Sequence, residues 1–165
     1  MAFVHDLLAG PLPAEYDACD VLYADLPWRA GFIEFERRAG AQGRSYADLM
    51  AAVSKIVRSA VCPVVLTCGK LAWSHLPLPR ETIHTRLNGA TCLALVYNAD
   101  FKPACADTVA LLHWLAERYR CVGDFCCGYG RAGRIFSEHG KRYIMSDYNS
   151  ECIGYIGETF EKANG

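Results

Sequence analysis

The tetrapeptide Asp25-Leu26-Pro27-Trp28 combines residue types that could hold an amine next to a planar ring. The Asp25 carboxylate and the Leu26 carbonyl could accept the two N–H groups of an aromatic amine, which favours the pyramidal nitrogen needed for nucleophilic attack. Pro27 restricts Leu26 to extended conformations, and Trp28 offers a face on which an extruded base can stack. The tetrapeptide indicates chemistry on an exocyclic or amide nitrogen; the alternative is a buried Trp after an ordinary strand end.

A second set of residues is typical of cofactor binding. Gly128, Gly130 and Gly133 form a G-x-G-x-x-G turn between an expected strand and an expected helix, where backbone N–H groups can approach an anionic group. Asp147 ends the next expected strand, 19 residues after Gly128, and could accept hydrogen bonds from both hydroxyls of a ribose. Asp124 places a carboxylate before the turn, where a cofactor amine could sit. We therefore expect a nucleoside-containing cofactor, with a plain tight turn and a solvated acid as the alternative.

Topology separates the two cofactors that fit this unit, a nicotinamide dinucleotide and S-adenosylmethionine. A dinucleotide fold continues after the acid through further strands and helices. Only 18 residues follow Asp147, enough for one helix. A dehydrogenase would have to be permuted, so the sequence favours S-adenosylmethionine.

The elements that must position these residues follow from hydrophobic periodicity. Strands are expected at residues 2–6, 20–25, 63–68, 91–97, 121–125 and 142–146. Helices are expected at 45–60, at 104–120, from the end of the 128–133 glycine turn to about 139, and from 150 onward. Strands that alternate with helices at this spacing predict an α/β domain with a mostly parallel sheet. Two segments lack a regular pattern: residues 29–44, expected as a long mobile loop, and residues 76–89, which are broken by prolines.

Composition indicates one compact domain that spans residues 1–165. The chain is 52% hydrophobic and 21% charged, with no apolar run long enough to span a membrane and no N-terminal leader. We therefore expect a cytoplasmic protein without membrane contact. Nine cysteines, an odd number, contain no C-x-x-C pair, which predicts reduced, mostly buried thiols and no metal site.

A net charge of −1 gives no global attraction to nucleic acid, so any such binding depends on local basic patches. The expected loop after the tetrapeptide carries four arginines that could contact phosphates: Arg29, Arg37, Arg38 and Arg44. Residues 76–89 could add to recognition through Arg80, His84, Arg86 and Asn88. A solvated, salt-bridged surface is the alternative for both segments.

These motifs resemble the amino-group DNA methyltransferases that use S-adenosylmethionine. Asp25-Leu26-Pro27-Trp28 resembles the family's D/N/S-P-P-Y/F/W target motif, and Asp124-Phe125-Cys126-Cys127-Gly128-Tyr129-Gly130 resembles its D-x-F-x-G-x-G cofactor loop. Phe101-Lys102-Pro103 resembles a motif on the other side of the cofactor, and His5-Asp6 resembles a short strand whose acid lies near the adenine. The target motif precedes the cofactor loop, as in the circularly permuted β group of that family.

The resemblance covers nearly the whole chain and implies a fold, a cofactor and residue roles. The implied fold is a Rossmann-like class I methyltransferase fold with a mostly parallel seven-stranded sheet, circularly permuted. Asp25, Leu26, Pro27 and Trp28 would hold the target base. The residues around S-adenosylmethionine would be Asp6 near the adenine, Asp147 on the ribose, Asp124, Phe125, Cys126, Gly128 and Gly130 around the methionine part, and Phe101, Lys102 and Pro103 on its other side.

The resemblance further implies transfer of a methyl group to N6 of adenine in DNA. RNA or a protein glutamine as substrate, and an inactive module that binds the cofactor or a partner, stay open as alternatives. Leu26 stands where the family has its first proline, and only Asn98-Ala99-Asp100 precede Phe101, where permuted members usually carry a recognition region. We therefore expect recognition to involve a second copy of the chain or a separate partner.

Overall fold

The computed structural model describes residues 1–40 and 43–163, with the side chains of residues 29–30 and 161–163 outside the description. The strands are β1 (Ala2–Val4), β2 (Val21–Asp25), β3 (Val64–Cys68), β4 (Glu81–Leu87), β5 (Ala90–Tyr97), β6 (Cys121–Asp124) and β7 (Arg142–Asp147). The helices are a 3-10 helix η1 (Ala14–Ala18), α1 (Arg29–Arg38), α2 (Tyr46–Ser59), α3 (Lys70–Trp73), α4 (Thr108–Arg118), α5 (Arg131–Glu138) and α6 (Ser150–Ala163).

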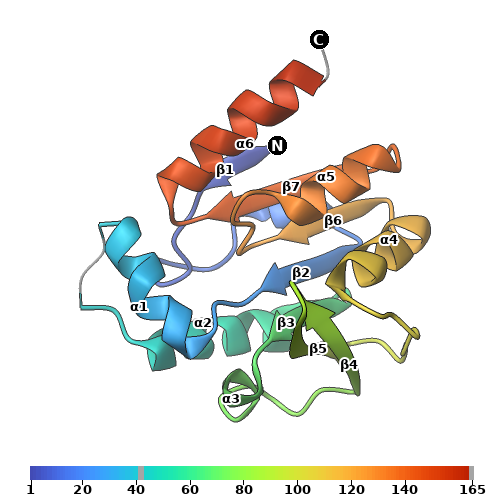
Figure 1. Cartoon of the computed structure of the whole chain (residues 1–165), viewed down its shortest axis with the longest axis horizontal. Coiled ribbons are helices and arrows are strands. Elements are labelled where there is room, and N and C mark those ends of the chain that lie inside the picture. Colours follow the sequence, from blue (N-terminus) through green and yellow to red (C-terminus); the bar gives the residue numbers. More distant parts are fainter. Residues whose placement is uncertain (41–42, 164–165) are drawn as a thin grey trace.

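The strands form a seven-stranded sheet in the order β1-β7-β6-β2-β3-β5-β4 (Figure 1). β1, β7, β6, β2 and β3 are parallel, whereas β5 is antiparallel to β3 and to the edge strand β4. The mostly parallel α/β sheet expected from the sequence is confirmed. The chain visits β1, then β2 and β3 at the centre, then the antiparallel pair, and only afterwards β6 and β7.

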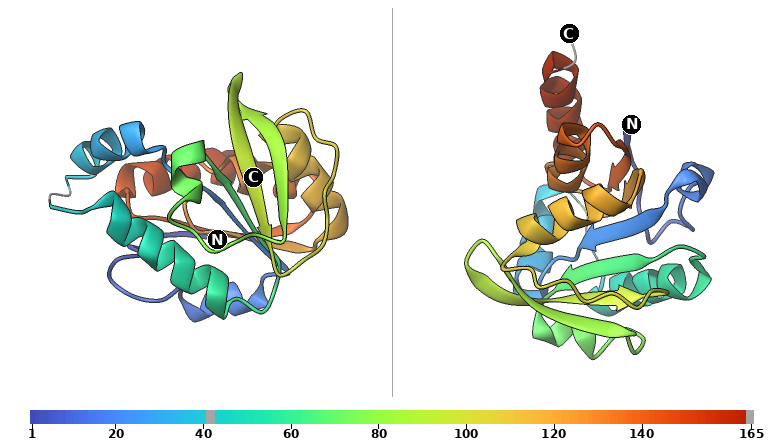
Figure 2. Two further views of the ribbon diagram at one scale, coloured as in Figure 1. Left: turned by 90° about the horizontal axis from the view of Figure 1, so that it is seen from below. Right: turned by 90° about the vertical axis from the view of Figure 1, so that its right-hand side faces the viewer.

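Helices lie on both faces of the sheet (Figure 2), and side chains that alternate along its strands build a core on each face. In β2, Leu22 and Ala24 face the core that α2 covers, while Val21 and Tyr23 face the core that α4 and α5 cover. This alternation follows from the period of two in an extended strand. The helix expected at residues 45–60 is confirmed as α2, and the Ser45 hydroxyl caps it by accepting from the Asp48 N–H at 3.0 Å.

The prediction of a mobile loop over residues 29–44 was wrong, because α1 occupies Arg29–Arg38. Gly31, Gly40 and Gly43 suggested a loop, but local contacts favour a helix. Glu34 pairs with both Arg37 and Arg38 one turn further on, an arrangement that stabilises helices. The buried Phe32 also anchors α1 by packing its ring edge-on against Tyr46, with ring centres 5.6 Å apart.

Residues 76–89 are also more regular than expected, since β4 pairs with β5 as a hairpin. The turn is Asn88-Gly89, and both residues have positive φ angles, of 49° and 84°. An Asn-Gly turn of this kind matches the twist of antiparallel strands. The prolines that precede β4 dominated the sequence pattern, although the alternation of exposed His84 and Arg86 with buried Ile83 and Thr85 follows a strand period.

The cysteines behave as the sequence predicted. All nine are free thiols, and six of them are buried.

No helix in residues 1–40 and 43–163 is long and apolar enough to cross a membrane.

Gly123 in β6 provides a test of the core packing. A Cβ at this position would lie 2.6 Å from the Tyr16 ring and 2.8 Å from Leu22. Tyr16 cannot retreat easily, because its hydroxyl donates to the Asp124 carbonyl at 3.0 Å. We expect Gly123→Ala to lower the free energy of unfolding by roughly 1–3 kcal/mol, as measured by urea denaturation.

Gly154 on α6 serves as the control, since nothing lies within 4 Å of its added Cβ. Gly154→Ala should raise the free energy of unfolding by about 0.5–1 kcal/mol because alanine is the better helix former. Equal stability of the two variants would contradict the close packing at Gly123.

Candidate active site

Four aspartates end or follow neighbouring parallel strands: Asp6 after β1, Asp147 in β7, Asp124 in β6 and Asp25 in β2. Because the carboxyl ends of parallel strands meet at one edge of the sheet, these residues lie along the same edge. Open α/β sheets bind their ligands at this edge. The fold thus brings the target tetrapeptide and the expected cofactor turn to one place.

Asp25 is half-buried and held by its neighbour in β3. The Thr67 hydroxyl donates to Asp25 Oδ1 at 2.8 Å, and the Tyr23 hydroxyl lies 3.1 Å from the same Thr67 oxygen. Asp25 Oδ2 has no hydrogen-bond partner in the part of the chain that the structure describes. Burial raises the pKa of Asp25, while the Thr67 hydrogen bond and the positive charge of Arg131 lower it. One carboxylate oxygen is therefore fixed and the other is available.

Leu26, Pro27 and Trp28 continue from this strand into α1. The Leu26 N–H donates to the Thr67 carbonyl at 2.9 Å, so the pairing of β2 with β3 continues past Asp25. The Leu26 side chain is buried. Trp28 caps α1 and is 37% exposed, and its ring lies 3.5 Å from the position of a Cβ on Gly69. The turn is fixed without a first proline, and it leaves a tryptophan face partly open.

The glycine turn is held by the acid that ends β7. Asp147 accepts from the Gly128 N–H at 2.9 Å and from the Asn149 N–H at 3.0 Å. Gly128 and Gly130 both have positive φ angles, of 48° and 79°, but their surroundings differ. A Cβ on Gly128 would meet nothing within 4 Å, whereas one on Gly130 would lie 3.0 Å from Ile156 in α6. Gly128 faces open space, and Gly130 is required by packing.

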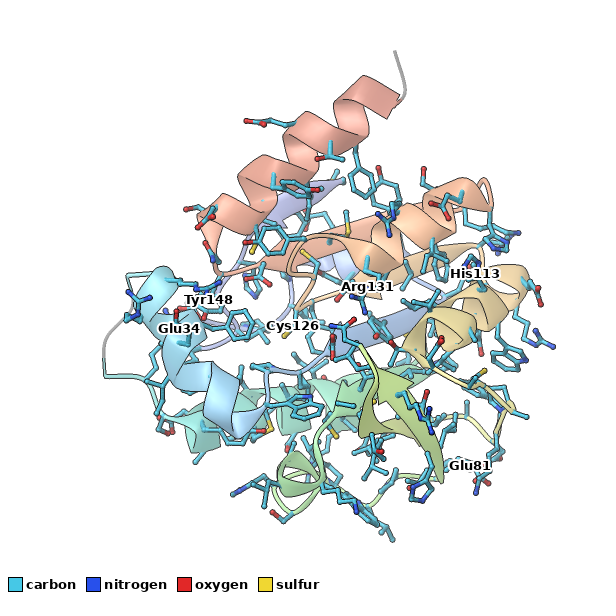
Figure 3. The ribbon with its side chains drawn as sticks, in the orientation of Figure 1. Glu34, Glu81, His113, Cys126, Arg131 and Tyr148 are labelled. Atoms are coloured by element: carbon cyan, nitrogen blue, oxygen red, sulfur yellow. The ribbon has the colours of Figure 1, made fainter. Side chains whose placement is uncertain are left out.

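Asp124 and Cys126 lie in the middle of the edge, where Figure 3 labels Cys126. The Cys126 N–H donates to Asp124 Oδ1 at 3.3 Å. Burial and the charges of Asp25 and Asp147 raise the pKa of Asp124 well above its ordinary value. Burial and the three carboxylates also raise the pKa of the Cys126 thiol, which stays protonated. The Phe125 side chain, expected to lie beside the cofactor, is buried in the core.

Among the lysine, arginine and histidine side chains that the structure describes, which exclude those of Arg29 and Lys162, none forms an ion pair with Asp25, Asp124 or Asp147. The edge is therefore rich in carboxylate charge that the described side chains do not balance directly. Within residues 1–40 and 43–163, no group of three or more His, Cys, Asp and Glu side chains is arranged to hold a metal ion.

Asp6 lies in a separate ionic cluster at the β1 end of the edge. Arg44 donates two hydrogen bonds to the Asp6 carboxylate, one of them at 2.9 Å. The Arg44 Nε atom lies 3.6 Å from Glu36 Oε2, and its guanidinium lies 5.3 Å from the centre of the Tyr148 ring. Arg44 thus connects the segment before α2 with the ends of β1, α1 and β7.

Phe101, Lys102 and Pro103 precede α4, and their contacts are with α4 and β4. The Phe101 ring packs on Trp114 with ring centres 4.9 Å apart, and Lys102 pairs with Glu81 at 3.5 Å. In the described residues, no hydrogen bond or ion pair links these three residues to the glycine turn.

The arginines expected to contact phosphates are engaged within the chain where their side chains are described. Arg37 and Arg38 share Glu34, and Arg44 holds Asp6. The side chain of Arg29 lies outside the described part of the structure. Sequence reasoning missed Thr67, Gly69 and Arg131, all of which touch or influence the tetrapeptide. The position of Thr67 and Gly69 at the end of a buried strand was the available signal.

The buried carboxylates make the stability of the fold depend on pH. Burial raises the pKa of Asp25, Asp124 and Asp147 above the ordinary value of 3.8. Between this value and the folded pKa, the folded chain holds more protons than the unfolded chain, so its free energy of unfolding falls as pH rises. Asp124→Asn keeps an acceptor for the Cys126 N–H, and we expect it to stabilise the chain at neutral pH and to flatten this dependence.

Urea unfolding between about pH 4 and about pH 8 measures both effects. Asp17→Asn, at an exposed position in η1, should leave the slope unchanged. If the free energy of unfolding depended more steeply on pH in Asp124→Asn than in wild type, the Asp124 carboxylate would not be the buried charge that destabilises the fold.

The sequence matches no protein-family model and no curated protein, but similar structures have been solved. The M1.HpyAVI-SAM complex is 13% identical with a TM-score of 0.60, and the match covers 95% of this chain and 96% of that chain. TTHA0409 from Thermus thermophilus, assigned provisionally as a DNA modification methylase and crystallised with S-adenosyl-L-methionine, is 12% identical with a TM-score of 0.60. That match covers 98% of this chain and 93% of the other. The chain therefore has the Rossmann-like methyltransferase fold that its motifs imply.

Proposed function

We propose that this chain is an S-adenosylmethionine-dependent methyltransferase that acts on the exocyclic amine of a nucleobase, N6 of adenine in DNA. The observation that carries the proposal is the geometry of Asp25. One of its oxygens is fixed by Thr67 at 2.8 Å, the other is available, and the partly exposed Trp28 follows two residues after Leu26. This arrangement suits a planar ring that carries an amine.

The residues of the edge fit the proposed cofactor. S-adenosylmethionine carries a sulfonium and an ammonium group. Burial raises the pKa of Asp124 and of Asp147, and the neighbouring carboxylates raise the pKa of Asp124 further. A bound cation would relieve this repulsion. Gly128 leaves open space at the turn. The fold neighbours M1.HpyAVI and TTHA0409 were both crystallised with this compound.

The cofactor, when bound, supplies a methyl group activated for transfer to a nucleophile. The chain has to orient the amine. Asp25 Oδ2 and the Leu26 carbonyl would accept its two N–H groups and so localise the nitrogen lone pair. Trp28 would stack on the ring. The pKa of Asp25, raised by burial, makes its carboxylate a stronger base than a solvated one, suited to take the proton that the amine loses.

The choice of DNA rests on TTHA0409, which is named for DNA modification. The choice of adenine rests on the acid in the tetrapeptide and its resemblance to the target motif. We further propose that a second copy of the chain or a separate partner supplies sequence recognition, since only Asn98-Ala99-Asp100 separate β5 from Phe101.

Substitution of Asp25 tests the assignment. Asp25→Asn should lower methyl transfer by roughly a hundredfold or more, because the amide places a donor or a weaker acceptor against the amine. Binding of S-adenosylhomocysteine, measured by calorimetry, should change little. Nucleoside mass spectrometry of DNA and RNA from a methylation-deficient host identifies the modified atom.

Asp17→Asn controls for the loss of an exposed acid in that host. A methylated base that is equally abundant with wild type and with Asp25→Asn would refute the role of Asp25. Equal loss of transfer and cofactor binding would refute the separation of the amine site from the cofactor site.

The two glycines of the turn separate cofactor binding from folding. We expect Gly128→Ala to weaken S-adenosylhomocysteine binding with a stability loss of only about 1–2 kcal/mol from its positive φ. Gly130→Ala should cost more stability, because its Cβ would also press on Ile156. Calorimetry measures binding and urea denaturation measures stability. Unchanged binding of S-adenosylhomocysteine to a folded Gly128→Ala would show that the cofactor does not bind at this turn.

A further inference from the structure

Basic residues gather in one part of the chain. Residues 49–99 contain a single acid, Glu81, and five basic residues: Lys55, Arg58, Lys70, Arg80 and Arg86. Since the net charge of the whole chain is −1, the rest of the chain is acidic. Glu81 pairs with Lys102 and Arg80 pairs with Asp100, whereas Lys55, Arg58, Lys70 and Arg86 have no ion pair among the described side chains. Positive charge is therefore concentrated on α2, α3 and the β4–β5 hairpin.

Three cations on α3, β4 and α5 form no ion pair with any carboxylate whose side chain the structure describes. Lys70 begins α3 and directly follows Gly69, against which the Trp28 ring lies. Arg86 is exposed near the end of β4, two residues before the hairpin turn. Arg131 begins α5, and its charge acts on Asp25.

The hairpin turn links two of these positions. Arg131 donates to the side-chain oxygen of Asn88 at 3.3 Å, which places the start of α5 beside the turn. Figure 1 shows the tip of the hairpin near the end of β2, with α1 on the other side of that strand end and α3 below; Figure 3 labels Arg131 at the hairpin tip. Unpaired cations thus approach the tetrapeptide from the α3 side and from the hairpin side.

Exposed apolar side chains accompany these cations on α3. Leu71 is 66% exposed and Trp73 is 41% exposed. A positively charged groove with exposed aromatic faces is the usual combination in proteins that bind nucleic acid strands, because the cations contact phosphates and the rings stack on bases. On the α1 side, Arg37 and Arg38 share Glu34, which offsets one of their two positive charges.

We infer that the DNA substrate of the proposed reaction lies across α3 and the tip of the β4–β5 hairpin, with Lys70, Arg86 and Arg131 at its phosphates. This inference rests on the proposed function and replaces the α1 arginines as the expected contact surface. It places the DNA backbone on the side of the tetrapeptide where Trp28 meets Gly69.

Charge reversal with a matched control tests this surface. Lys70→Glu/Arg86→Glu and Arg37→Glu/Arg38→Glu change the net charge equally, and all four side chains are exposed. Binding to a fluorescein-labelled DNA duplex is followed by anisotropy over a range of salt concentrations, with S-adenosylhomocysteine present. The Lys70/Arg86 variant should bind roughly tenfold or more weakly, and its salt dependence should flatten by about 0.9 log units per lost phosphate contact.

The control variant should bind DNA nearly as tightly as wild type. Greater loss in the Arg37/Arg38 variant, or no loss in either, overturns the inference. Binding only to RNA of the same sequence overturns the choice of DNA. Calorimetry with S-adenosylhomocysteine on wild type separates the two proposals. DNA binding through Lys70 and Arg86 without cofactor binding supports this surface and contradicts the methyltransferase. Cofactor binding without DNA binding through Lys70 and Arg86 contradicts only the surface.

Discussion

The parallel pairing of β2 with both β6 and β3 is the constraint on which the site depends. It puts the end of β2 between β6, which carries Asp124, and β3, which carries Thr67. Asp25 therefore has Thr67 on one side and Asp124 on the other. Neither neighbour is close in sequence. The sheet also has an electrostatic cost, because it removes several carboxylates from water at one edge without pairing them with described cations.

This electrostatic cost is informative about function. Stability alone would favour neutral side chains at Asp124 and Asp147, since burial raises the pKa of both. Carboxylates at such places are typical of sites where a ligand completes the charge balance. In this chain the acidic edge and the basic surface of α3 and the hairpin border one another at the tetrapeptide. A cationic cofactor and an anionic polymer could therefore meet there without competing for the same charges.

Much of this arrangement was predictable from the sequence, and the failures have physical causes. The strands, the glycine turn and the tetrapeptide follow from apolar runs and from glycine and proline positions, which are local signals. The α1 helix was missed because its glycines suggested a loop, whereas Glu34 and the packing of Phe32 on Tyr46 stabilise a helix. The pairing of Arg44 with Asp6 could not be predicted, since it joins residues 38 positions apart through tertiary structure. Thr67 was missed for the same reason.

The packing of Gly130 connects the cofactor turn to the last helix. Ile156 and Phe160 of α6 lie within 3.4 Å of the position that a Cβ at Gly130 would take. The position of α6 therefore limits how closely the turn can pack against the core. α6 also packs against β7, which neighbours the strand before the turn, and against the edge strand β1. A truncation, fusion or partner that shifts α6 would thus alter affinity for the proposed cofactor from a distance, although the helix carries none of the residues proposed for the site.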